Sequence, residues 1–134
     1  MWLSARAERV TTVEHDKEWF ERTRSRVPGN VEVRYRPLDD TDSYETSVRE
    51  SGDAYDLVLV DGRRRVAAAI AAMDAVTDRG VIVWDNSERE RYDHGIEALA
   101  ERGWRCIDFT GLGPVNVSVS TTSVFYRPGN VLDI

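Results

Sequence analysis

Residues 55–62 of this chain are Tyr-Asp-Leu-Val-Leu-Val-Asp-Gly, a nearly continuous apolar run that ends in an acid and a glycine. Such a run is typical of a strand buried on both faces of a parallel sheet. Its last residues then lie at the carboxyl end of the strand, where α/β sheets bind their ligands. Residues 81–86, Val-Ile-Val-Trp-Asp-Asn, repeat this pattern. We therefore predict two strand tips that carry Asp61, Asp85 and Asn86.

The sequence between and after these two strands has the periodicity of helices. Between them, apolar side chains at helical spacing predict a helix over residues 63–76 that closes at residues 77–80. After them, Ser87 and Glu90 have the spacing of a capping box and predict a helix that stops at Gly103.

The N-terminal part continues the same alternation. Residues 9–14 are rich in β-branched side chains and predict a buried strand that ends at Glu14. Asp16 is a suitable cap for a helix that runs to about Arg26, where a proline and a glycine follow.

The next segment is more polar. Residues 31–38 alternate apolar and charged side chains, which predicts a half-exposed strand at a sheet edge. For residues 39–53 we favour a solvated loop over a single helical turn around residues 44–49.

Two further strands are expected at residues 104–109 and 122–126, with a turn at residues 111–114 between them. Strands without an intervening helix suggest an antiparallel pair. We predict an α/β fold with a Rossmann-like, mostly parallel sheet, helices on both faces and an antiparallel C-terminal strand pair. At 134 residues the chain is expected to form a single domain, 1–134.

The composition of the chain argues against nucleic acids and membranes as partners. The formal net charge of −6 argues against a broad nucleic-acid surface, so a small-molecule substrate is expected. No apolar run approaches the ~20 residues that cross a bilayer, so no membrane partner is expected. The single cysteine, Cys106, cannot form an internal disulfide, and no secretory signal pattern opens the chain. We therefore expect a cytoplasmic location.

From residues 9–14 onward, the order of strands, helices and strand-tip acids resembles the class I S-adenosylmethionine-dependent methyltransferases. The resemblance covers essentially the whole chain. In that family an acid that ends the second strand hydrogen-bonds the cofactor ribose, which implies this role for Glu14, with His15 and Asp61 also at the cofactor. The resemblance implies a methyltransferase-like protein that uses S-adenosylmethionine and acts on a small molecule.

The resemblance starts at the family's second strand. The family's first strand and its Gly-x-Gly loop have no counterpart ahead of residue 9, so we expect an N-terminally truncated fold that binds the cofactor weakly or not at all. Gly111 and Gly113 do not replace the loop because no helix follows them. Since the family's first strand lies between the second and the fourth, the strands at residues 9–14 and 55–60 are expected to pair directly or to be covered in a homo-oligomer.

Asp61, Asp85 and Asn86 are similar to the metal-ligand set of the catechol-type O-methyltransferases. This likeness implies a magnesium ion that orients a substrate hydroxyl, and oxygen ligands suit that hard cation. The alternative is structural, because Asp85 and Asn86 lie where a helix entry needs capping and Asp61 begins an ordinary strand-to-helix turn. The lysine that this family uses near the metal has no counterpart here.

The remaining candidate residues are weaker. Arg63, Arg64 and Arg65 follow the Asp61 tip at a helix start, where a guanidinium is suited to a substrate carboxylate or phosphate. Solvation is expected for at least two of them, and Arg63 is the candidate for the substrate. His94 is expected on a helix surface, and Cys106 is expected to be a buried, inert thiol. Two other functions stay open: a non-catalytic binding or assembly domain that kept the fold and lost the cofactor loop, and a dinucleotide-binding oxidoreductase.

Overall fold

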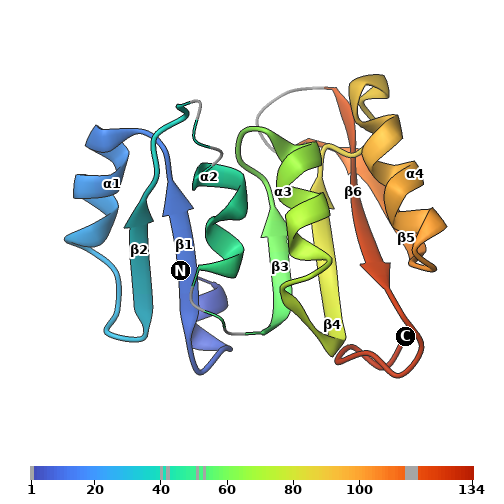
Figure 1. The fold of residues 1–134 in the computed structure, drawn as a ribbon, viewed down its shortest axis with the longest axis horizontal. Coiled ribbons are helices and arrows are strands. Elements are labelled where there is room, and N and C mark those ends of the chain that lie inside the picture. The colour runs from blue at the N-terminus through green and yellow to red at the C-terminus, as the bar shows by residue number, and fades with distance from the viewer. Residues whose placement is uncertain (1, 40, 42, 51, 53, 114–117) are drawn as a thin grey trace. The chain divides into compact units, whose positions relative to one another are not determined.

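The computed structural model divides into two compact units, Met1–Ser47 and Val48–Ile134, each with its own sheet (Figure 1). It describes all of the chain except residues 1, 40, 42, 51, 53 and 114–117. The order of the strands is β1-β2 in the first sheet and β3-β4-β6-β5 in the second. The two expected alternatives for β1 and β3, direct pairing or coverage in a homo-oligomer, stay predictions. The single domain expected from the length stays a prediction.

The first unit is built on two parallel strands, β1 (Val10–Glu14) and β2 (Val31–Tyr35). A short 3-10 helix, η1 (Leu3–Ala5), precedes them, and α1 (Lys17–Arg24) connects them. The predicted cap is confirmed, because the Asp16 carboxylate accepts a hydrogen bond from the Trp19 amide at 2.9 Å.

Part of the predicted solvated loop is helical, so that prediction is wrong for this part. It forms α2 (Ser43–Thr46) and a 3-10 turn, η2 (Ser47–Arg49). Glu45 and Ser47 are buried, and the Ser47 hydroxyl donates to the Tyr44 carbonyl at 2.7 Å. These are polar side chains, so their burial leaves no hydrophobic period in the sequence. Residues 40, 42, 51 and 53 of the same prediction lie outside the described residues.

The second unit holds a mixed sheet of four strands. β3 (Tyr55–Val60) and β4 (Val76–Asp85) are parallel. β6 (Val119–Tyr126) lies between β4 and β5 (Arg105–Leu112) and is antiparallel to both. The α/β class with an antiparallel C-terminal pair is therefore confirmed. Residues 111–112 of the expected turn belong to β5, and residue 114 lies outside the described residues.

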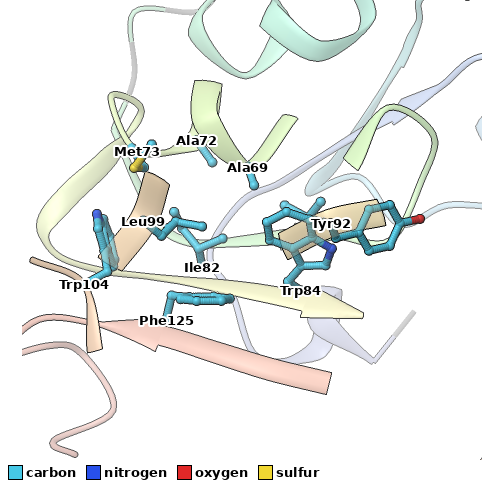
Figure 2. Packing of buried hydrophobic residues seen from close by; sticks show 10 residues of the cluster. Ala69, Ala72, Met73, Ile82, Trp84, Tyr92, Leu99, Trp104 and Phe125 are labelled. Atoms are coloured by element: carbon cyan, nitrogen blue, oxygen red, sulfur yellow. The ribbon is translucent and has the colours of Figure 1, made fainter. Parts of the chain in front are cut away.

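Helices α3 (Arg65–Ala72) and α4 (Asp93–Glu101), the latter preceded by η3 (Glu90–Tyr92), cover one face of this sheet. Trp84 lies in the core between them and the sheet, with ring centroids 5.6 Å from Tyr92 and 6.2 Å from Phe125 (Figure 2). The core consists of Val60, Ala69, Ala72, Met73, Ile82, Trp84, Tyr92, Leu99, Trp104 and Phe125. No helix in the described part of the chain is long and apolar enough to cross a membrane.

Two boundaries of the predicted elements are wrong. The helix predicted over residues 63–76 ends at Ala72, and residues 76–80 belong to β4. The Tyr55 amide donates to the Ala75 carbonyl at 2.8 Å, so this stretch already pairs with β3. Apolar residues that continue a helical period also suit a strand, and only the pairing separates the two. β3 is not buried on both faces either, because Leu59 is 48% exposed.

The predicted capping box at Ser87 is also wrong, because α4 begins at Asp93. The buried Ser87 hydroxyl instead bonds the Ser123 hydroxyl at 2.5 Å and the Thr121 carbonyl at 3.2 Å. The Glu88 carboxylate accepts from the Thr121 amide at 2.8 Å. Both side chains therefore connect the end of β4 to β6, so neither caps the helix.

Gly95 permits the close contact between α4 and Trp84. A Cβ at this position would lie 2.7 Å from Cη2 of Trp84 and 3.0 Å from Cγ1 of Val66. Trp84 is fully buried, so its ring has no space into which to move.

We expect Gly95→Ala to lower the free energy of unfolding by roughly 1–2 kcal/mol, because overpacking exceeds the helix-propensity gain of about 1 kcal/mol. Urea denaturation measures this change. Gly111→Ala is the matched control in the same unit, since a Cβ there meets nothing within 4 Å. A Gly95→Ala variant as stable as the wild type would contradict the prediction.

Candidate functional site

The tips of β3 and β4 meet at one edge of the second sheet. Val60 pairs with Trp84 in the parallel register, so Asp61 and Asp85 leave their strands at the same level. The expected proximity of these tips is thus present within the second unit.

A guanidinium group lies between the two tips. Arg65 Nε donates to the Gly62 carbonyl at 3.0 Å, and Nη2 donates to the Asp61 carbonyl at 2.7 Å and to Asp61 Oδ1 at 3.0 Å. Nη1 donates to the Asp85 carbonyl and to Asn86 Oδ1, the latter at 3.2 Å. The Arg65 side chain is only 10% exposed. The sequence suggested Arg65, like Arg63 and Arg64, as a group for a substrate carboxylate or phosphate; its contacts with the two strand tips were not predicted.

Asp85 and Asn86 have further partners. Asp85 Oδ1 accepts from the Thr122 hydroxyl at 2.9 Å, and Asp85 Oδ2 lies 3.6 Å from Arg65 Nη1. Asn86 Oδ1 also accepts from Arg89 Nη2 at 2.9 Å. The Asn86 backbone has a φ of 52°, a left-handed conformation that asparagine adopts more readily than most residues.

Asp61 is the residue of this edge whose protonation is most disturbed. Desolvation at the strand tip raises the pKa of its carboxyl, although its side chain is 59% exposed. The Arg65 guanidinium lowers this pKa, whereas the charge and hydrogen bonding of Asp85 raise it further. The Asp61 carboxyl therefore holds a proton more readily than an isolated aspartic acid does.

In the first unit, Glu14 ends β1 as predicted. Its Oε1 accepts from the backbone amides of His15 and Asp16 at 2.7 and 2.9 Å, and it lies 3.1 Å from His15 Nδ1. The His15 ring stands edge-on to Tyr44, with centroids 5.9 Å apart. Within the described part of the chain, Glu14 Oε2 accepts no hydrogen bond. The carboxylate is thus fixed through one oxygen, and its predicted role at a ribose stays a prediction.

The remaining candidate residues are His94, Arg63 and Cys106, and the structure agrees with the predictions for only some of them. His94 is exposed on α4 as predicted, and Arg63 is exposed with its substrate role untested. The expected burial of Cys106 is wrong, because its side chain is exposed on β5. Desolvation of the sulfur and the neighbouring Asp108 carboxylate raise the pKa of the Cys106 thiol to about 11. At neutral pH the thiol is protonated, which leaves it a poor nucleophile.

The described residues contain no group of three or more His, Cys, Asp or Glu side chains that could hold a metal ion. The predicted ligand set has only two carboxylates, Asp61 and Asp85, with the Asn86 amide as its third member.

Replacing Asp61 by asparagine tests the electrostatics of this edge. The raised pKa favours protonated Asp61 in the folded chain, so its contribution to stability is complete below pH 3.8 and is lost as pH rises through the raised value. Asp61→Asn keeps an oxygen for Arg65 and carries no charge. We expect the unfolding free energy of Asp61→Asn, relative to that of the wild type, to rise by a few tenths of a kcal/mol between about pH 4 and pH 8. Asp78→Asn on β4 is the control. A difference between Asp61→Asn and the wild type that shrinks with rising pH would contradict the raised pKa of Asp61.

No protein-family model matches this sequence, and no curated protein matches it. Its structure is similar to that of a protein assigned as a methyltransferase from Streptococcus mutans in complex with S-adenosylhomocysteine (TM-score 0.66, 8% identity, 94% of this chain and 80% of that chain). It is similar to the N-methyltransferase NodS from Bradyrhizobium japonicum (TM-score 0.63, 13% identity, 95% and 78%). It is also similar to the O-methyltransferase TomG from Streptomyces achromogenes in complex with S-adenosylmethionine (TM-score 0.67, 20% identity, 90% and 62%). This chain therefore spans less than two thirds of TomG, and it has the Rossmann-like fold of the S-adenosylmethionine-dependent methyltransferases.

Proposed function

We propose that this chain is a methyltransferase-like protein that binds S-adenosylmethionine through Glu14 and acts on a small molecule. The observation that carries this proposal is the state of the Glu14 carboxylate at the carboxyl end of β1. Two backbone amides hold its Oε1, and Oε2 accepts no hydrogen bond from the described residues.

A carboxylate held in this way suits a pair of vicinal hydroxyls. Hydrogen bonds from hydroxyls to an ionised carboxylate are about twice as strong as neutral ones. The two amides fix the direction of the carboxylate before any ligand arrives, which lowers the entropy cost of binding. His15, which lies against Glu14 and Tyr44, is proposed to contact the same ligand.

The similar structures support S-adenosylmethionine as the cofactor but do not identify the methyl acceptor. The Streptococcus mutans protein was solved with S-adenosylhomocysteine and TomG with S-adenosylmethionine. TomG is an O-methyltransferase, whereas NodS is an N-methyltransferase. The net charge of −6 favours a small acceptor over a nucleic acid. Transfer to such an acceptor is a direct displacement at the sulfonium, for which positioning supplies most of the catalysis.

Replacing Glu14 by glutamine tests the cofactor role. Glutamine keeps an oxygen for the two amides and replaces the other oxygen by an NH₂ group, which cannot accept from a hydroxyl. We expect Glu14→Gln to weaken the binding of S-adenosylhomocysteine by a factor of about ten or more, because the hydroxyls lose a charged acceptor. Chemical-shift titration measures the affinity of the wild-type chain and of the variant.

Glu18→Gln on α1 is the matched control for this titration, because it removes a carboxylate from an exposed position near Glu14. Unchanged affinity in Glu14→Gln would remove Glu14 from the site.

The alternative function, an assembly domain, has one observation in its favour. β1 and β3 each have a hydrogen-bonded neighbour on one side only among the described strands. Large apolar side chains are also exposed in the second unit: Leu59, Phe109, Leu112, Val119, Leu132 and Ile134. Uncovered strand edges and apolar surface favour association.

We expect this chain to form a homo-oligomer, because strand edges of this kind seldom stay uncovered. Light scattering coupled to size-exclusion chromatography measures the molar mass directly. A molar mass that stays at 15.2 kDa at every concentration tested would contradict this expectation.

A further inference from the structure

The tips of β3 and β4 point five oxygen acceptors at one place. We call this set the strand-tip cluster: the Asp61, Gly62 and Asp85 carbonyls, Asp61 Oδ1 and Asn86 Oδ1. Carbonyl, amide and carboxylate oxygens that converge in this way are the donor set of a hard cation. The positive group at their centre is the Arg65 guanidinium.

The guanidinium is saturated by these contacts. Arginine has five N–H donors, and each of the five hydrogen bonds to the strand-tip cluster uses one of them. No N–H of Arg65 is left to grip an anionic substrate. Its side chain is 10% exposed, so its charge is compensated mainly by Asp61 and Asp85. The role of Arg65 is therefore to hold the tips and to balance their charge.

The predicted magnesium ligands do not fit a divalent cation beside this group. Asn86 Oδ1 already accepts from Arg65 and Arg89, and Asp85 Oδ1 accepts from Thr122. A metal ion would have to break several of these bonds and lie within contact distance of a guanidinium of the same sign. Moving Arg65 away would also leave its charge without the oxygens that now solvate it.

We propose that Arg65 is the permanent cation of the strand-tip cluster and that the cluster takes no divalent metal ion. Its positive charge is supplied by the chain and is present at every metal concentration. This inference concerns the cluster alone, and it holds whether or not the chain binds S-adenosylmethionine. Any acceptor that binds at this edge must then be oriented by protein groups and not by a metal.

Direct metal binding is the first test. The free Mn²⁺ signal in electron paramagnetic resonance reports binding without any need for activity. We expect the full wild-type chain at neutral pH to show no saturable binding up to about 1 mM Mn²⁺, and its melting temperature to be the same in Mg²⁺ and in EDTA. Saturable binding that Asp85→Asn abolishes would overturn the proposal.

Arg65 variants give the second test. Arg65→Ala leaves the two carboxylates without a cation, and we expect its melting temperature to fall by about 5–10 °C. Mn²⁺ is expected to restore part of this loss, because the vacated oxygens then suit a metal. Arg89→Ala is the matched control, since Arg89 contacts Asn86 without reaching either carboxylate. Equal melting temperatures for Arg65→Ala and Arg89→Ala would overturn the proposal.

Arg65→Lys keeps the proposal testable if Arg65→Ala fails to fold. Lysine keeps the charge and loses the planar fork, so its melting temperature should lie between those of the wild type and Arg65→Ala. A lysine variant as unstable as the alanine variant would show that the positive charge is not what the cluster requires, which contradicts the proposal.

Discussion

The parallel pairing of β3 with β4 is the interaction on which the second unit depends. Its register places Val58 beside Ile82 and Val60 beside Trp84, and these four side chains face α3 and α4. Fully burying one such side chain stabilises a fold by about 1.5–3 kcal/mol. The same register brings the two strand tips to one level. The packing of the core and the geometry of the candidate site therefore have a common cause.

That geometry creates an electrostatic problem, which Arg65 resolves. Two parallel strands that end in acids bring Asp61 and Asp85 close together, and like charges at short range are unfavourable. α3 begins at Arg65, directly after the β3 tip, and its first side chain turns back between the acids. Arg64, just before it, has a φ of 45°, an uncommon conformation for this residue type. The sharp entry into α3 accompanies the return of Arg65 to the tips.

Most of the fold could be predicted because it is encoded locally. The Asp16 cap, the apolar run of β3 and the acids at the strand tips are all neighbours in sequence of the elements they define. What was missed depends on partners far along the chain. Ser87 matches a capping pattern, yet its partners Thr121 and Ser123 are on β6 and come together with it only after folding. The role of Arg65 between the tips was missed for the same reason, because the oxygens that it bonds lie on two strand tips separated by a whole helix.

The central claim is that a guanidinium, and not a metal ion, balances the acids at the strand tips. Nitrogen-detected NMR of the arginine side chains tests it most directly, because it observes the N–H groups themselves. If Arg65 is bonded through all five donors, its Nη protons should give separate signals that exchange slowly with water and do not shift on addition of Mg²⁺. An Arg65 signal that is averaged by free rotation, like that of an exposed arginine, or that moves with Mg²⁺, would contradict it.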